Sequence, residues 1–149
     1  MYQLSIVTPD RVFYEGEVVS LTAPGVAGYL GVLSGHAPLL TPFAVGKLTF
    51  RDSSGKTFLA ALSGGFLEVS KKGAIILADS IEFPDEIDRA RAEQAAEKAR
   101  QRLAKKEGID IPRATASLKR AENRLAVAQE GMLSASAAAW ENFTQTEVG

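Results

Sequence analysis

The chain of 149 residues has no cysteine and only one histidine, His36. The absence of cysteine excludes disulfides, zinc–thiolate centres and thiol nucleophiles. A single histidine has no second imidazole with which to hold a metal, and no G-x-S-x-G motif supplies a nucleophile for it. We therefore predict no active site and no metal site. His36, within GVLSGHAPLL, is expected to shape a turn in which Gly31 and Gly35 supply unusual backbone dihedrals.

The chain also lacks any apolar run approaching about 18 residues and any basic, then apolar, leader. We expect neither a membrane span nor a signal peptide. The net charge of −1 gives no general attraction to polyanions. Eleven of the 17 Lys and Arg residues fall between Arg89 and Arg124, but nine acidic residues are interleaved with them across the helical region. Since no aromatic residues flank these cations for base stacking, nucleic acid is not an expected partner.

Residues 1 to about 83 are rich in β-branched and aromatic residues, and turn signals recur at short intervals. The turns D-S-S-G at 52–55 and K-K-G at 71–73 each separate two apolar runs and predict hairpins. Short strands of this kind stack as a sandwich or close as a barrel. The stretch SGGF at 63–66 lacks the lysine and the following helix of a phosphate loop, so we interpret its glycines as relieving backbone crowding.

After Phe83 the apolar period becomes helical. Asp85 is a candidate helix cap, and no Gly or Pro occurs between it and Lys106. Gly108 and Gly131 are predicted to end two helices, over 85–106 and 113–130. A short connector makes such helices antiparallel neighbours. Their facing stripes are mostly alanine: Ala92, Ala96, Ala99 and Leu103 on the first helix, and Ala114, Leu118, Ala121, Leu125 and Ala128 on the second.

An alanine-lined hairpin is weakly held. A methyl-sized group contributes about 0.8 kcal/mol on burial, whereas ordering each backbone unit costs about 1 kcal/mol or more. We expect the hairpin to open at small cost. The predicted fold class is α+β, with an N-terminal antiparallel β-sandwich over 1–84 and a C-terminal antiparallel two-helix hairpin over 85–131. The tail, 132–149, is either disordered or forms a short helical turn that docks Trp140 and Phe143.

Four cations form the one constellation that points to a ligand. Arg91 and Lys98 are seven residues apart, and Arg120 and Arg124 are four apart, so each pair shares a helix face. Antiparallel pairing would bring both faces to one side of the hairpin, where an anion would relieve their repulsion. In the alternative interpretation the cations point into water or pair with the acidic residues Glu93, Glu97 and Glu122.

Several stretches together resemble a known family. In order, they are SIVTPDRVFYEGEV, GYLGVLSGHAPLL, LSGGFLEV, ILAD and EIDRARA. The chain resembles the epsilon subunit of bacterial F-type ATP synthase, whose counterparts are the chloroplast epsilon and mitochondrial delta subunits. The resemblance covers about residues 1 to 130. It implies a ten-stranded β-sandwich followed by a helical hairpin, in a subunit without catalytic activity of its own.

The resemblance also implies partners. Such a subunit sits on the rotor, or central stalk, binds the gamma subunit and the membrane c-ring, and couples proton-driven rotation to ATP synthesis. In many bacteria the hairpin extends toward the alpha and beta subunits and blocks ATP hydrolysis. We expect peripheral attachment, through partners only, at the cytoplasmic face of a bacterial plasma membrane, because Met1 is unprocessed and no transit segment precedes the domain. The alternatives are a free-standing nucleotide-sensing module and an enzyme on a β-sandwich.

The resemblance assigns a docking loop. The stretch GYLG at 28–31 matches the family's contact with the c-ring, and His36 belongs to the adjoining G-H-x-P turn. An acidic residue is common where this chain has Tyr29, so packing or the hydroxyl would replace a charge pair. The docking residues implied are Gly28, Tyr29, Leu30, Gly31 and His36.

The resemblance assigns a nucleotide site as well. No cofactor is required, but some members bind ATP as a regulatory ligand between the folded helices. There the arginines would hold phosphates, while Ile87 and Ala92 face the base or sugar. Lys98 stands where the family has an arginine, which removes a planar, bidentate phosphate contact. The matching residues are Glu82, Ile87, Asp88, Arg91, Ala92, Lys98, Arg120 and Arg124.

Overall fold

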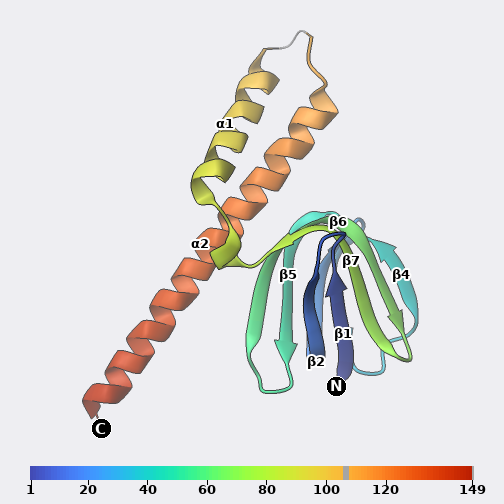
Figure 1. Ribbon diagram of the computed structural model, residues 1–149, viewed down its shortest axis with the longest axis vertical. Helices are drawn as coiled ribbons and strands as arrows, with labels where there is room; N and C mark the ends of the chain where they lie inside the picture. The colour runs from blue at the N-terminus through green and yellow to red at the C-terminus, as the bar shows by residue number, and fades with distance from the viewer. Residues whose placement is uncertain (106–107, 149) are drawn as a thin grey trace. The chain divides into compact units, whose positions relative to one another are not determined.

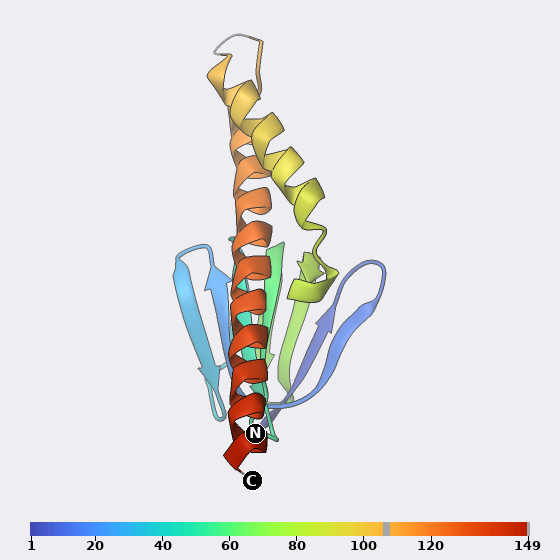
Figure 2. The ribbon, with the colours of Figure 1, turned by 90° about the vertical axis from the view of Figure 1, so that its left-hand side faces the viewer.

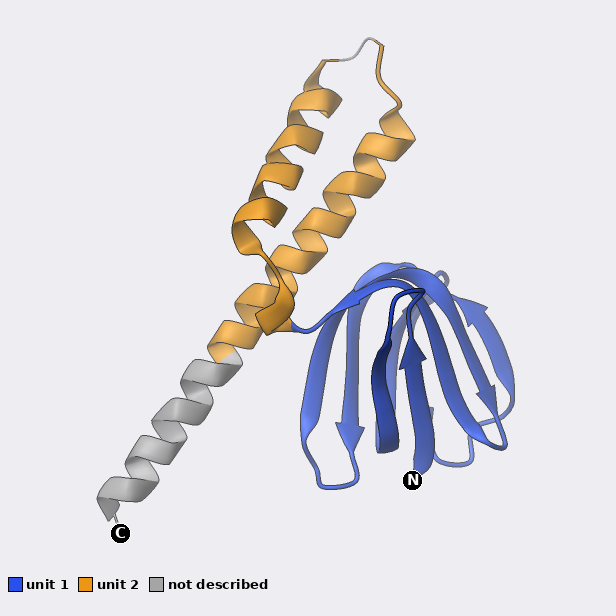
Figure 3. Cartoon of the chain, in the orientation of Figure 1, with its two compact units in different colours: residues 1–83 blue, residues 84–149 orange. Residues whose placement is uncertain are grey.

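The computed structural model describes residues 1–105 and 108–133, together with the helical backbone of 134–148. The chain forms two compact units, residues 1–83 and 84–149 (Figure 3). The first is built of strands and the second of helices (Figure 1). The predicted α+β class, a β-sandwich followed by a pair of helices, is confirmed.

Seven strands form one sheet in the first unit, in the order β1-β7-β6-β5-β2-β3, with β4 paired to β6. Because β1 also pairs with β2, the sheet closes on itself. One pairing departs from the expected antiparallel pattern, since β1 and β7 run parallel. The strands are β1 (Tyr2–Val7), β2 (Val12–Gly25), β3 (Gly28–Leu33), β4 (Leu39–Pro42), β5 (Val45–Asp52), β6 (Thr57–Ser70) and β7 (Gly73–Glu82).

The strand count of seven among the described residues differs from the ten that the resemblance implied. The reason is the length of β2 and β6, which have 14 residues each. β2 pairs with β1 near its start and with β5 and β3 near its end. β6 likewise pairs first with β5 and then with β7 and β4. A long strand that changes partners along its length replaces two shorter strands, which lowers the strand count.

Both predicted hairpins are confirmed, at the β5–β6 and β6–β7 turns. In the first, Asp52 Oδ1 accepts hydrogen bonds from the N–H groups of Ser54 and Lys56, each over 2.9 Å. The Ser54 hydroxyl also donates to this carboxylate, which lowers the pKa of Asp52. Gly55 and Gly73 supply the positive φ values, 91° and 129°, that these turns require.

Backbone crowding does explain the glycines of SGGF. Gly64 and Gly65 have φ values of 72° and 108°, and a Cβ on Gly65 would lie 1.9 Å from the Leu77 carbonyl oxygen. The core lies inside the closed sheet. Its largest fully buried side chains in this unit are Phe50, Leu4, Ile6, Leu21, Leu48, Leu62, Leu67, Ile76, Val18 and Val32.

The second unit starts with a 3-10 turn, η1 (Pro84–Glu86), followed by α1 (Arg89–Ala104) and α2 (Ile111–Val148). The predicted cap at Asp85 is wrong. Asp88 caps α1 instead, its Oδ1 accepting from the Arg91 N–H over 3.1 Å. Pro84 explains the difference, because the turn it opens ends before α1 begins.

The alanine stripes meet as predicted. Helices α1 and α2 run side by side in both views (Figures 1 and 2). Leu103, Leu118 and Leu125 are half-buried at the edges of the stripes. The alanines at the centre of the contact are buried, namely Ala92, Ala96, Ala99, Ala114, Ala121 and Ala128.

The prediction that Gly131 ends the second helix is wrong, because α2 continues through this residue. The glycine serves a close contact instead, since a Cβ at this position would lie 2.3 Å from the Pro84 Cβ. The backbone of α2 continues to Val148, whereas the side chains of Trp140 and Phe143 lie outside the described residues.

Candidate functional site

The docking loop is the turn between β2 and β3. Gly28 has φ 129°, as the turn requires, whereas Gly31 lies within β3 without a positive φ. The expectation of an unusual dihedral at Gly31 is therefore wrong, because β3 pairs regularly with β2 there. Leu30 packs against the core and anchors the strand beneath the loop.

Tyr29 is the most prominent side chain of the docking loop. It is 61% exposed, and its hydroxyl accepts a hydrogen bond from the Lys47 N–H over 3.0 Å. A Cβ on Gly46 would lie 2.7 Å from this hydroxyl oxygen and 2.6 Å from the Pro24 Cβ. Gly46 therefore leaves the space that the Tyr29 hydroxyl occupies. The result is an exposed aromatic side chain that a hydrogen bond ties to β5.

His36 makes the contacts of a turn residue. Its backbone N–H donates to the Leu33 carbonyl over 3.1 Å, and its ring Nδ1 donates to the Ala37 carbonyl over 2.7 Å. Gly35 precedes it with φ 82°, as predicted. The imidazole thus hydrogen-bonds to the backbone of its own turn. It lies at the rim of a hollow of about 430 Å³ that Tyr2 and Lys71 also line.

Sequence reasoning missed an exposed apolar surface, here named the sheet patch: Leu40, Phe66, Ile75 and Leu77. The four are 44–71% exposed and lie on the neighbouring strands β4, β6 and β7. Phe66 stands opposite Leu77, while Glu68 stands opposite both Leu40 and Ile75. The signal was available, because FLEV and AIILA carry apolar residues on both faces of their strands. Exposed apolar side chains gathered on neighbouring strands, here with Glu68 among them, are typical of a surface that binds a partner.

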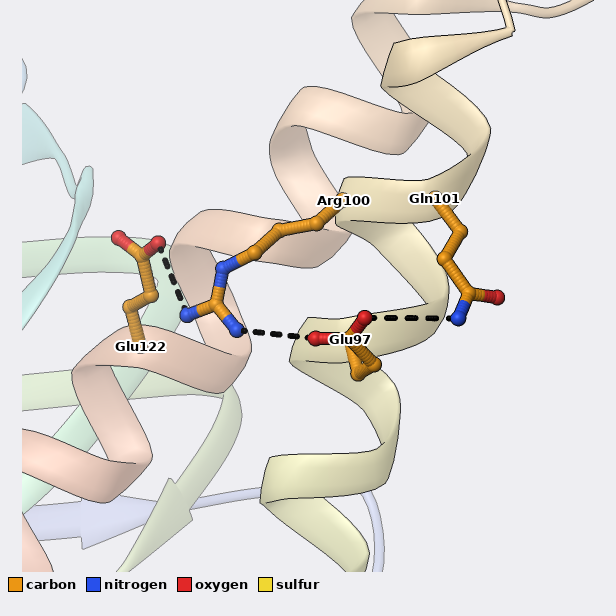
Figure 4. A network of polar contacts seen from close by, with 4 residues as sticks. All are labelled: Glu97, Arg100, Gln101 and Glu122. Atoms are coloured by element: carbon orange, nitrogen blue, oxygen red, sulfur yellow. Dashed lines mark hydrogen bonds and ion pairs between the residues drawn. The ribbon is translucent and has the colours of Figure 1, made fainter.

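The charges of the hairpin are divided between two sides. Arg100 of α1 lies 3.7 Å from Glu97 and 3.7 Å from Glu122 of α2, and Gln101 donates to Glu97 (Figure 4). Both glutamates therefore contact Arg100, which defines one side of the hairpin. Glu97 and Glu122 are two of the three acidic residues that the alternative interpretation paired with the four candidate cations.

The four cations share the opposite side. A helix turns about 100° per residue, so side chains two residues apart, or nine, point in nearly opposite directions. Lys98 is two residues from Arg100, and Arg91 is nine from it. Arg120 and Arg124 are each two residues from Glu122. The geometry therefore brings Arg91, Lys98, Arg120 and Arg124 to one side, as the spacing had predicted.

The same register sets their levels along the hairpin. With Arg100 level with Glu122 and a rise of about 1.5 Å per residue, Lys98 and Arg124 are nearly level with each other. Arg120 lies about 6 Å from that level in one direction, and Arg91 about 10 Å in the other. A ligand that used all four would have to extend along the hairpin.

The other predicted nucleotide contacts are placed differently. Ala92 is fully buried and Ile87 is 8% exposed, so neither offers surface to a base or sugar in this conformation. Asp88 is the cap of α1. Glu82 is the last residue of β7, in the first unit. Of the predicted contacts, the register of the helices thus groups only the four cations on one side of the hairpin.

The described residues contain neither a metal-binding cluster nor a membrane-spanning helix. No group of three His, Asp or Glu side chains among them is placed to hold a metal ion. None of their helices combines the length and the apolar character that crossing a bilayer demands.

Comparison with known proteins identifies the family. The model of the ATP synthase delta/epsilon chain β-sandwich domain matches residues 1–84, and that of the long α-helix domain matches 85–129. The ATP synthase epsilon chain of Moorella thermoacetica is 48% identical over 126 residues, 84% of this chain and 94% of that protein. That of Halalkalibacterium halodurans is 46% identical over 127 residues, 84% of this chain and 95% of that protein.

Solved structures agree with these sequences. A chain in the OSCP/F1/c-ring structure of the Euglena gracilis mitochondrial ATP synthase superposes with a TM-score of 0.74 at 25% identity, covering 89% of this chain and 81% of that one. The two domains found here in order define a delta/epsilon-type stalk subunit. The chain belongs to the ATP synthase epsilon subunit family, a component of the central stalk of the F-type enzyme.

Proposed function

We propose that the chain is a rotor subunit without an active site that binds the gamma subunit and the c-ring and helps couple proton-driven rotation to ATP synthesis. The observation that carries this proposal is the pairing of a closed, densely packed sheet with two exposed surfaces fit for partners. The sheet patch offers four apolar side chains, and the docking loop offers Tyr29. Attachment to the cytoplasmic face of the membrane would then run through these partners.

Affinity capture from native membranes tests the docking proposal. The wild-type chain should recover gamma and c-ring subunits. The double variant Phe66→Glu/Leu77→Glu places two charges in the sheet patch and should reduce recovery at least about tenfold, because charges are strongly disfavoured at the centre of an interface. Ser53→Glu, in the exposed β5–β6 turn, is the control. If the wild-type chain recovers neither partner, the rotor proposal fails and a free-standing nucleotide-sensing module becomes the better reading.

The helical unit is proposed to inhibit ATP hydrolysis by opening and reaching the alpha and beta subunits. Its support is the contact between α1 and α2, whose buried centre is lined by alanines, so that opening it exposes little apolar surface. In the reconstituted complex, deletion of the residues after Asp85 should raise ATPase activity. Unchanged ATPase activity would contradict the inhibitory role proposed for this chain.

ATP is proposed as a regulatory ligand of the folded hairpin, held by Arg91, Lys98, Arg120 and Arg124. The support is their placement on one side, away from the Arg100–Glu122 pair. Ligand at about 100 times its dissociation constant would stabilise the folded form by about 2.7 kcal/mol. Calorimetric titration should give heat with the wild type, and much weaker binding with Arg91→Ala or Arg120→Ala.

Lys119→Ala supplies the matched control for the ATP titration. Lys119 is three residues from Glu122, which places it on the other side of the hairpin with the same loss of one charge. Equal heat in all variants, or none in the wild type, would remove the nucleotide proposal and leave the docking proposal untouched.

A further inference from the structure

A second cationic hollow lies at the connector end of the hairpin. It measures about 450 Å³, and its lining includes Arg102 and Lys105 from the end of α1 and Arg113 from the start of α2. Gly108, with φ 71°, and Asp110 complete the turn beside it. Liquid water occupies about 30 Å³ per molecule, so the hollow has room for a small hydrated anion.

The charge of this hollow is unbalanced. Asp110 is the one acid among the described residues that line it, and that carboxylate accepts from the Arg113 N–H over 3.1 Å as the cap of α2. Three cations against one carboxylate leave a surplus of positive charge. Since cations of both helices line the hollow, their like charges disfavour a close approach of the two helices there.

The hollow adjoins the candidate ATP site and extends from it toward the connector. Arg102 is two residues from Arg100, and Arg113 is nine from Glu122, so both lie on the cationic side. By the register of the Arg100–Glu122 pair, Arg102 is level with Arg120, whereas Arg113 lies seven residues, about 10 Å, further toward the connector. Arg91 lies 11 residues, about 16 Å, from Arg102 at the other end of the cationic side.

We infer that this hollow binds a phosphate group, held by Arg102 and Lys105 of one helix and Arg113 of the other. Arginine suits a phosphoryl oxygen pair because its planar fork donates two parallel hydrogen bonds. An anion shared by both helices converts their repulsion into a link. Its binding therefore closes the hairpin at the connector end, whether the group is free phosphate or part of a nucleotide.

Hydrogen exchange of the full chain in phosphate, against chloride of equal ionic strength, tests the inference. Phosphate should slow exchange in α1 and in the described part of α2. Arg102→Gln and Arg113→Gln should each raise the phosphate concentration needed by about tenfold, while Lys119→Gln leaves it unchanged. Equal exchange in the two salts, or an equal loss in Lys119→Gln, would overturn the inference. The replaced side chains are exposed, and circular dichroism verifies that each variant folds.

Arg91→Ala distinguishes this site from the proposed ATP site and identifies the source of the phosphate group. The variant should keep the full phosphate effect even where it loses ATP binding. If ATP displaces phosphate from Arg91→Ala, the hollow accepts nucleotide phosphates; if it does not, the ligand is free phosphate. Loss of the phosphate effect in Arg91→Ala would show one shared site and overturn the inference of a separate one.

Discussion

At the scale of single residues, Tyr2 connects stability to alkaline pH. Its hydroxyl donates to the Val32 carbonyl over 2.7 Å, and burial raises the pKa of Tyr2 to about 12. The unfolded phenol titrates near pH 10, so between these values the folded state keeps a proton that the unfolded state releases. The contribution of Tyr2 is therefore complete below about pH 10 and is lost as the pH rises toward 12.

Titration of phenolate absorbance measures this directly. Of the three tyrosines, Tyr2 should supply the last component to ionise, and Tyr2→Phe should remove it. Tyr14→Phe is the control, because burial raises the pKa of Tyr14 as well and its loss should remove a different component. A last component that survives in Tyr2→Phe would contradict the assignment.

The glycines of β6 give a second prediction at this scale. Gly65→Ala combines a φ of 108° with a Cβ 1.9 Å from the Leu77 carbonyl oxygen, and should lower the free energy of unfolding by about 2–4 kcal/mol. Gly28→Ala has a φ of 129° but no atom within 4 Å, so only about 1–2 kcal/mol of backbone strain is expected. Urea unfolding followed by circular dichroism compares the two. Equal losses would show that crowding at Gly65 is relieved by movement of β7.

At the scale of elements, Gly131 joins the start of the helical unit to α2. Alanine is the better helix former by about 1 kcal/mol, yet Gly131→Ala should weaken the unit, because its Cβ would lie 2.3 Å from that of Pro84. In Pro84→Gly, which removes the opposing atom, the same substitution should become stabilising. Hydrogen exchange of the α2 amides measures both. Stabilisation by Gly131→Ala in the wild-type background would contradict the contact.

The elements also show what sequence could predict and where it stopped. The alanine stripes and the shared side of the four cations follow from spacing within each helix, which is local information. The choice between Asp85 and Asp88 as the cap of α1 depended on the turn that Pro84 begins. The role of Gly131 depended on its contact with Pro84, a residue far away in the sequence. Likewise, the axial levels of the cations required the register that Arg100 and Glu122 reveal.

At the scale of the whole molecule, the two units should differ in stability. The sheet unit buries large side chains such as Phe50 and Leu62, whereas the described side chains buried in the helical unit are six alanines with Ile87 and Val127. Because buried apolar area sets the main stabilising term, the hairpin should open at lower free energy than the sheet. Native-state hydrogen exchange with increasing urea should show α1 and the start of α2 exchanging first. Equal protection in both units would refute a hairpin poised to open.

The closed sheet has a consequence for synthesis. The strand made first, β1, bonds in parallel to the strand of its unit made last, with partners as distant as Leu4 and Ala74. On the ribosome one edge of β1 therefore stays bare until β7 emerges, and bare edges invite pairing with other chains. Joining such remote segments is also slow. The nascent chain is most prone to aggregation in the interval before its seventh strand is complete.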